Sequence, residues 1–420
     1  MKRLLLALAF APGALLAAVI GHNTPAPEMS PARLAELPAA QRPAWRAYLD
    51  RSDRQMAFDR ATLARELKAG DTVPPPPTAG KMNAPLEREA AWYASAEAKA
   101  IADTILSFQT PSGGWSKNQD RSKPPRLPGQ RYSNNAETMT VGTGSFDEPR
   151  DRYWTFVGTL DNDATHSEIR FLARVNQQRP GEAYQAAILK GIGYLLMAQY
   201  PNGGWPQNYP LEGGFHDGIT FNDDAVSEAA RLLQDVAKAT PEFAFVPEPL
   251  RRQARSAAAR AVDLLLAAQV KVDGRPTAWP QQIDAVTLAP ISARNYEPRS
   301  LASAESAAVL LFLMQQPRPT PAMKAAIESG VAWLQTHALR DHVFTMTPDG
   351  RKLIPQPGAG PLWSRLYDVP TGRPIFGDWP KTIHDDVNEI SKGRRNGYTW
   401  WGTWPQKALD AYPRWKAENP

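Results

Sequence analysis

The sequence predicts an all-α protein, an (α/α)3 toroid of repeated helical hairpins with long irregular loops and an N-terminal arm. A helical stretch that ends in glutamine and leads into a tryptophan-bearing loop occurs three times. After each loop comes a second helical stretch that begins at an acidic or small polar cluster. Three such helix pairs packed in a ring would form a closed version of a solenoid. An open bundle of unrelated hairpins is the alternative interpretation.

The first helix type is recognised by its loop. Gly-Gly-Trp follows the first two stretches, with the tryptophan six residues after the glutamine, whereas the third loop is longer and lacks the glycine pair. Glycine allows a chain to leave a helix sharply. The three stretches with their loops are residues 101–118, 193–208 and 262–282.

The second helix type is predicted from its start and from its apolar spacing. Its polar clusters lie at residues 161–165, 222–225 and 303–306. After the second cluster, apolar residues recur at helical intervals, which predicts one buried face. After the third, residues 309–314 are apolar on all sides, as expected of a helix that is covered all round.

The composition excludes several classes of protein. Hydrophobic residues make up 42% and charged residues 22% of the 420, values that allow a sizeable core and exclude a wholly disordered chain or a polytopic membrane protein. Without cysteine there can be no disulfide, thiolate nucleophile or cysteine-bound zinc. The 40 prolines predict stiff connections, and the 13 tryptophans are more than such a core requires.

The N-terminus predicts export. Lys2 and Arg3 precede a short apolar run, which is typical of a signal peptide over residues 1–21, cleaved after Ala18 or Gly21. A single uncleaved anchor is the alternative. We expect a secreted or periplasmic protein that is a monomer, has no nucleic-acid partner, and does not bind a membrane once the signal is removed.

The remaining chain divides in two. Residues 22–84 form a Pro/Ala-rich N-terminal arm that ends in four consecutive prolines, a stiff spacer. Residues 85–420 carry the motifs and are predicted to be one toroidal catalytic domain.

Four aspartates lie at the starts of the second helix type. Asp163 and Asp224 are placed to cap the helices. Asp161 and Asp223 occupy equivalent earlier positions and would point into one cleft, where two oxygen donors with open positions suit Ca²⁺. The same pair also suits a glycosidase that uses two carboxyl groups, so this alternative stays open.

Four basic residues lie in loops rich in aromatic residues and proline. Arginine matches a planar carboxylate with two hydrogen bonds, so several cations on one cleft would hold an acidic sugar polymer. A surface ion pair is the alternative for each one taken singly. These residues are Lys117, Arg294, Arg365 and Arg373.

Taken together, these motifs resemble the pectate lyases of polysaccharide lyase family 10. The matching stretches include residues 109–118, 159–175, 199–210, 218–226, 293–306 and 361–405, and cover most of residues 86–410. The resemblance implies a toroid, dependence on Ca²⁺, and anti β-elimination of α-1,4-polygalacturonate to 4,5-unsaturated oligogalacturonides.

The resemblance also implies roles for individual residues. Arg294, in the sequence Ala-Arg-Asn-Tyr-Glu, matches the catalytic base, and Asp161 and Asp223 match the metal ligands. Substrate binding is implied for Asn162, Lys117, Arg365 and Arg373.

One departure from the family stands out. The chain has Gly-Asp-Trp-Pro at residues 377–380, where the family commonly has Gly-Asp-Arg-Asp. Trp379 replaces a cation and could stack on a sugar, change the substrate or lower the activity. Two rival functions therefore remain at this point, a glycosidase of plant polysaccharides and a non-catalytic uronate-binding protein.

Overall fold

The computed structural model describes residues 19–81, 83–134 and 144–420. Most of the predicted signal peptide therefore lies outside the described residues. Among those described, no helix is both long and apolar enough to cross a membrane. The α-helices are α1 (Arg42–Ala64), α2 (Ala96–Ser107), α4 (His166–Gln178), α5 (Glu182–Ala198), α6 (Ala225–Lys238), α7 (Glu248–Ala267), α8 (Ser303–Met314), α9 (Pro321–Thr336), α10 (Lys392–Gly397) and α11 (Trp404–Glu418).

The strands are mostly very short. They are β1 (Val19–His22), β2 (Ile219–Thr220), β3 (Lys271–Val272), β4 (Arg275–Pro276), β5 (Gln282–Ile283), β6 (Leu301–Ala302), β7 (His342–Thr347), β8 (Gly350–Pro355), β9 (Trp363–Ser364), β10 (Leu366–Tyr367), β11 (Phe376–Gly377), β12 (Thr382–His384) and β13 (Trp401–Gly402).

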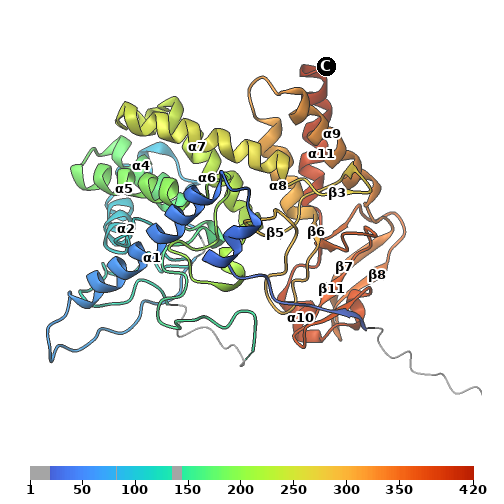
Figure 1. The fold of residues 1–420 in the computed structure, drawn as a ribbon, viewed down its shortest axis with the longest axis horizontal. Coiled ribbons are helices and arrows are strands. Elements are labelled where there is room, and N and C mark those ends of the chain that lie inside the picture. Colours follow the sequence, from blue (N-terminus) through green and yellow to red (C-terminus); the bar gives the residue numbers. More distant parts are fainter. Residues whose placement is uncertain (1–18, 82, 135–143) are drawn as a thin grey trace, which may run out of the picture.

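The prediction of an all-α protein was wrong. Helix accounts for 45% and strand for 12% of the structure, and the described strands form one three-stranded sheet and five two-stranded sheets, all antiparallel. In Figure 1 the helices α1, α2 and α4 to α7 occupy one side of the molecule, while β7, β8 and β11 lie below α8, α9 and α11 on the other. The structure is thus mixed α/β, and a closed ring of helices is not confirmed.

Helical hairpins are present, but they do not join the predicted pairs: each helix of the second type packs against the helix that follows it in the chain. Helix α4 packs against α5, α6 against α7, and α8 against α9. In α6 the residues at helical spacing, among them Val226, Ala230 and Leu233, are fully buried, as their periodicity predicted. These hairpins supply most of the main hydrophobic core.

The repeated tryptophans are core residues. Trp115, Trp205 and Trp279 are fully buried, and each indole Nε1 donates a hydrogen bond, of 2.7–2.8 Å, to a carbonyl near the end of the preceding helix. Trp363 repeats this contact with the carbonyl of Leu334 at 2.7 Å, after α9. An indole buried in this way contributes to packing and has no face left for a sugar.

The strands were missed for two reasons. Three of the pairings, β2–β5, β6–β10 and β9–β13, join two-residue strands from loops far apart in the chain, so they leave no run of alternating residues to detect. The β7–β8 hairpin is different, because its six-residue strands are joined through Pro348-Asp349-Gly350, a recognisable turn sequence whose glycine is the first residue of β8. That signal was present in the sequence and was overlooked.

The segment predicted to be an arm packs on the body. Strand β1, of which residues 19–21 belong to the predicted signal peptide and only His22 to the predicted arm, pairs antiparallel with β12, which also pairs with β11. Farther along, Trp45 and Tyr48 of α1 are buried in the main core, and the Tyr48 hydroxyl donates to the carbonyl of Ala198 at 2.9 Å. The division into an arm and a catalytic domain stays a prediction.

Candidate active site

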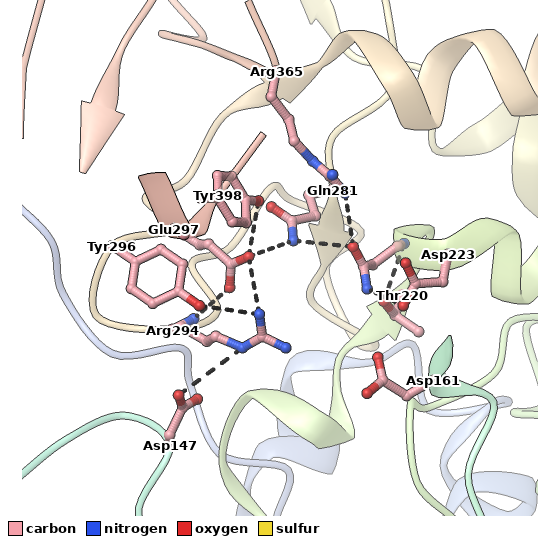
Figure 2. Close-up of polar contacts among 12 residues, drawn as sticks. Asp147, Asp161, Thr220, Asp223, Gln281, Arg294, Tyr296, Glu297, Arg365 and Tyr398 are labelled. Atoms are coloured by element: carbon pink, nitrogen blue, oxygen red, sulfur yellow. Dashed lines mark hydrogen bonds and ion pairs between the residues drawn. The ribbon is translucent and has the colours of Figure 1, made fainter. Parts of the chain in front are cut away.

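The two predicted carboxylates are brought together by two short 3-10 turns, η3 (Asp161–Asp163) before α4 and η5 (Asn222–Asp224) before α6. These turns contact each other. Each has a residue in the left-handed backbone region, Asn162 at φ 52° and Asp223 at φ 51°, a conformation that asparagine and aspartate tolerate better than most residues. The backbone N–H of Asn162 donates to Asp223 Oδ2 at 3.1 Å, which places the Asp223 carboxyl beside η3. Figure 2 shows Asp161 and Asp223 facing the same space.

Asp161 is a buried, charged carboxylate. Its Oδ2 is paired with the ammonium of Lys117, and its Oδ1 accepts a hydrogen bond from Gln207 Nε2 at 2.7 Å. Burial alone would raise the pKa of Asp161, but the charges of Lys117 and Arg294 hold that pKa well below its ordinary value. Lys117 also lies over the Phe156 ring, 3.6 Å from its centre, which fixes the ammonium in place.

Asp223 differs from Asp161 although the residue type is the same. Burial and the negative charge of Asp161 raise the pKa of Asp223 to about 7. Two carboxyl groups this close cannot both ionise easily without a cation between them. The pair therefore holds a proton at low pH and presents two negative groups at higher pH.

Arg294 lies on a tight loop between β5 and β6. The Ala293 amide donates to the carbonyl of Glu297 at 3.0 Å, and the Glu297 amide donates to the carbonyl of Arg294 at 2.9 Å. The guanidinium Nη1 of Arg294 donates to the Tyr296 hydroxyl at 3.1 Å, and its Nε lies 4.0 Å from Asp147 Oδ2. The Arg294 side chain is 29% exposed, so it can reach a ligand.

Acidic neighbours control the charge on Arg294. The carboxylate of Glu297, 3.8 Å from Nη1, is the largest cause that raises the pKa of Arg294 well above its ordinary value. Burial raises the pKa of Asp147 to about 6, so this neighbour titrates near neutral pH. In the ligand-free protein Arg294 is therefore a firmly charged cation.

Glu297 is the buried centre of this network, and its role was missed from the sequence. Its Oε1 accepts hydrogen bonds from Gln281 Nε2 at 3.0 Å and from the Tyr398 hydroxyl at 2.9 Å, and its Oε2 accepts one from the Arg294 amide at 3.1 Å. Figure 2 shows these bonds converging on one carboxylate. Glu297 and Tyr398 lie in two separate stretches that match the family. Nothing in either stretch indicates that these two residues, 101 positions apart in the chain, form a hydrogen bond.

Arg365 reaches the site from the loop between β9 and β10. Its Nη2 donates to Asn222 Oδ1 at 3.0 Å and to Glu305 Oε1 at 2.6 Å, and its guanidinium lies over the Tyr398 ring at 5.2 Å. A cavity of about 450 Å³ adjoins these groups and is lined by Arg365, Asp223, Glu305 and Trp404 among others.

Of the predicted binding residues, Asn162 and Lys117 lie at the carboxylate pair and Arg365 beside it. Arg373 is not brought into this network. Its side chain is exposed, and its backbone carbonyl accepts a hydrogen bond from the Asp368 backbone N–H, which closes a turn. Among the described residues, Arg373 has no ion-pair partner. The adjoining Gly372 lies against the His337 ring at the end of α9.

Trp379 is an exposed aromatic residue close to Arg294. Half of its surface is exposed, and its ring meets the ring of Tyr296 edge to face at 4.9 Å between centres. The guanidinium of Arg394 stacks on the same group, 3.8 Å from the Tyr296 ring and 4.9 Å from the Trp379 ring. Arg394 therefore supplies a cation beside Trp379, although its guanidinium is stacked on the rings of Tyr296 and Trp379.

The carboxylate pair is an incomplete set of metal ligands. In the described part of the chain, no group of three or more His, Cys, Asp or Glu side chains is arranged to hold a metal ion. Asp161 and Asp223 supply only two carboxylates; the neighbouring Asn222 turns its amide nitrogen to Asp223 and its amide oxygen to Arg365. Such a set fits Ca²⁺, which takes six to eight oxygen ligands, only if water or a bound acid provides the others.

Three comparisons with known proteins bear on this site. The family model described as pectic acid lyase matches residues 109–409. The family 10 polysaccharide lyase from Cellvibrio cellulosa is similar in structure, with a TM-score of 0.65 and 31% identity over 80% of this chain and 99% of that one. A mutant of that lyase in complex with trigalacturonic acid gives a TM-score of 0.65 and 30% identity over 77% of this chain and 95% of that one. A search of curated proteins gave no match.

Proposed function

The chain belongs to the pectic acid lyase family and is a polysaccharide lyase, and from this premise we propose that it cleaves α-1,4-polygalacturonate by calcium-assisted anti β-elimination. Arg294 is the proposed base. One observation carries the proposal. The guanidinium of Arg294, paired with Glu297, lies in the same site as the carboxylates of Asp161 and Asp223.

The proposed reaction needs a base and charge stabilisation. Arg294 removes the C5 proton of a galacturonate, and the electrons form the C4–C5 double bond while the C4–O bond breaks. The departing oxygen takes a proton from solvent and becomes the reducing end of the neighbouring sugar. Negative charge develops on the uronate carboxylate as the proton leaves, so cations held around that carboxylate lower the barrier. The products are a new reducing end and a 4,5-unsaturated oligogalacturonide.

The residues of this chain divide the work. Asp161 and Asp223 would hold Ca²⁺, which supplies positive charge next to the substrate carboxylate. Lys117 and Arg365 bind further uronate carboxylates. The backbone N–H of Asn162 holds the Asp223 carboxyl in position. Arg373 lies outside this network and is proposed to meet the substrate only farther along the polymer.

The charge on Arg294 is the demanding part of the mechanism. The pKa of Arg294 is raised in the ligand-free protein, first by Glu297, so the neutral base is scarce. Bound Ca²⁺ would add positive charge near Arg294 and a bound polymer would exclude water, and both changes would favour loss of the arginine proton. We expect the rate to rise with pH for this reason.

The glycosidase alternative uses the same carboxylates differently. A glycosidase needs its two carboxyl groups about 5 Å or more apart, with the sugar between them. Here Asp161 raises the pKa of Asp223 through its charge and through a hydrogen bond, and Asp223 in turn affects Asp161 through a hydrogen bond, so the two carboxyl groups lie next to each other. That arrangement supports a cation shared by the pair over a sugar ring held between them.

An absorbance assay tests the proposal. Purified protein is incubated with deesterified polygalacturonate and Ca²⁺, and the ultraviolet absorbance of the unsaturated uronide is followed with and without EDTA. The proposal requires an increase in absorbance that EDTA abolishes. Reducing ends without absorbance would indicate a glycosidase, and binding without either product would indicate a uronate-binding protein.

Export is part of the proposed function, because the polymer is outside the cell that secretes the enzyme. A signal peptide over residues 1–21, a Pro/Ala-rich arm and a monomeric catalytic domain from residue 85 are proposed with it. Of the two cleavage positions, the one after Ala18 leaves β1 whole.

A further inference from the structure

The N-terminal strand reaches the loop of the proposed base. Strand β1 pairs with β12, and the residue that follows it, Asn23, donates its backbone N–H to the carbonyl of Lys381 at 2.7 Å. In Figure 1 this dark blue segment runs along the strand region of the C-terminal part of the chain. Pairing with β12 therefore fixes where the side chain of Asn23 lies.

The Asn23 side chain holds two consecutive carbonyl groups. It is 8% exposed, and its Nδ2 donates to the carbonyl of Arg294 at 3.0 Å and to the carbonyl of Asn295 at 3.1 Å. A side-chain amide has two N–H donors, and both are used here. Because successive carbonyls are held, the peptide unit between Arg294 and Asn295 has one orientation, which fixes the direction in which the Arg294 side chain leaves the backbone.

Other contacts fix the same loop, one of them from the N-terminal segment. The Ser292 hydroxyl donates to the carbonyl of Thr24, so the loop is joined to the N-terminal segment at both its start and its middle. The side chain of Asn295 accepts from the Phe146 amide at 2.9 Å and donates to the carbonyl of Trp379 at 3.3 Å. Asn23 is the only described residue outside residues 292–297 whose side chain donates to the carbonyls of Arg294 and Asn295.

We propose that Asn23 is a positioning residue for Arg294, so that a segment outside the 109–409 family match takes part in building the site. The inference rests on the proposed role of Arg294 as the base. A base must approach the C5–H bond along one line, and a displacement of about 1 Å costs on the order of a hundredfold in rate. Binding of the polymer depends on other cations, so loss of Asn23 affects turnover and leaves affinity nearly unchanged.

The test uses the full chain and two substitutions. Asn23→Ala removes both donors, and Asn23→Asp keeps the shape but places a carboxylate against two carbonyls. We expect kcat on polygalacturonate to fall about 10- to 100-fold in Asn23→Ala and further in Asn23→Asp, with KM within about twofold of wild type. Asn202→Asp is the control: Asn202 Nδ2 donates to the carbonyl of Ala285 at 2.8 Å, so this change disturbs the same β5–β6 connection without touching the carbonyls of Arg294 and Asn295.

Hydrogen exchange supplies a readout that does not depend on activity. We expect the amides of residues 293 and 297, which close the Arg294 loop, to exchange at least tenfold faster in Asn23→Ala, while those of α6 are unchanged. A wild-type protein without lyase activity would defeat the proposed function, and the exchange result would still decide this inference. Unchanged exchange in the loop, or a kcat loss no larger than in Asn202→Asp, overturns it.

Discussion

Arg294 and Glu297, three residues apart on one loop, form a partly buried ion pair in which Nη1 and Oε1 are 3.8 Å apart. Glu297 also accepts the backbone N–H of Arg294, so one carboxylate both shapes the loop and stabilises the charge on the guanidinium. The same contact therefore holds the proposed base in place and opposes its deprotonation.

Replacing Glu297 with glutamine should move the pH profile of activity. Glu297 is the largest cause of the raised pKa of Arg294, so its removal lowers that pKa. A base acts when deprotonated, and its activity rises with pH up to its pKa; the Glu297→Gln profile of kcat/KM should therefore be displaced to lower pH. Rates measured from about pH 7 to 11 check this. A profile that falls in height without moving along the pH axis would contradict the role of Glu297.

Loss of the proposed base, Arg294, should stop turnover without unfolding the protein. We expect Arg294→Ala to lower kcat by about 10²- to 10⁴-fold, the usual contribution of a general base. Arg294→Lys keeps the charge but changes its position, and we expect a similar loss. Absorbance assays and thermal unfolding should be run side by side. Full activity in either variant would remove Arg294 from the mechanism.

Calcium affinity should depend on pH through Asp223. Its pKa is raised to about 7, so the carboxyl is protonated below that pH and ionised above it. Ca²⁺ needs the ionised form, so its apparent dissociation constant should rise about tenfold per pH unit below 7. Titration calorimetry with Ca²⁺ between pH 6 and 8 measures this.

The control for calcium binding is the neighbouring carboxyl. Asp223→Asn should bind Ca²⁺ more weakly and lose the pH dependence over that range. Asp224→Asn removes a charge from the same turn without removing the group that faces Asp161, and it should retain both. Equal behaviour of the two variants would exclude Asp223 as the ligand that titrates.

Trp379 should contribute to substrate affinity through its exposed ring. We expect Trp379→Ala to raise KM for oligogalacturonates roughly three- to tenfold, the range of an aromatic contact. Trp379→Arg should recover affinity at low salt and lose it at high salt, because a charge contact is screened and stacking is not. An unchanged KM in Trp379→Ala would mean that the ring does not contact the sugar.

Glu212 should make stability fall as pH rises. Burial raises its pKa to about 8, while its side chain accepts hydrogen bonds from Thr155 and Asn208 at 3.0 Å each. The folded protein thus binds a proton that the unfolded chain releases above its ordinary pKa of 4.5. Between these values stability should decrease with a slope approaching about 1.4 kcal/mol per pH unit.

Glu212→Gln keeps a neutral group of the same shape. The variant should match wild type near pH 5 and be the more stable of the two near pH 8, by denaturant unfolding. Other buried carboxyl groups affect the stability of wild type and variant alike. The quantity to measure is therefore the difference in free energy of unfolding between the two proteins. A variant that is less stable at both pH values would show that the carboxyl is needed for its geometry alone.

Much of the helical framework and of the site could be predicted from residues near one another in the chain. The buried face of α6 follows from apolar residues one turn apart, and the repeated tryptophans mark the ends of α2, α5 and α7 because each bonds a carbonyl only 10 to 14 residues away. The residue types of Lys117, Arg294 and Arg365, with the repeat positions of the aspartates, were enough to indicate an acidic substrate and a cation.

Only the tertiary structure decided which strands pair, which carboxyl groups are charged and which contacts hold the Arg294 loop. Two-residue strands exist because distant loops meet, and Arg373 is left outside the network because its turn packs beside α9. Asp161 and Asp223 are identical in sequence terms, yet Lys117 keeps one ionised while burial and the first carboxylate raise the pKa of the other. Asn23 lies 271 residues from Arg294. Local patterns record contacts along a helix, whereas charge state and loop geometry depend on neighbours that the fold alone brings together.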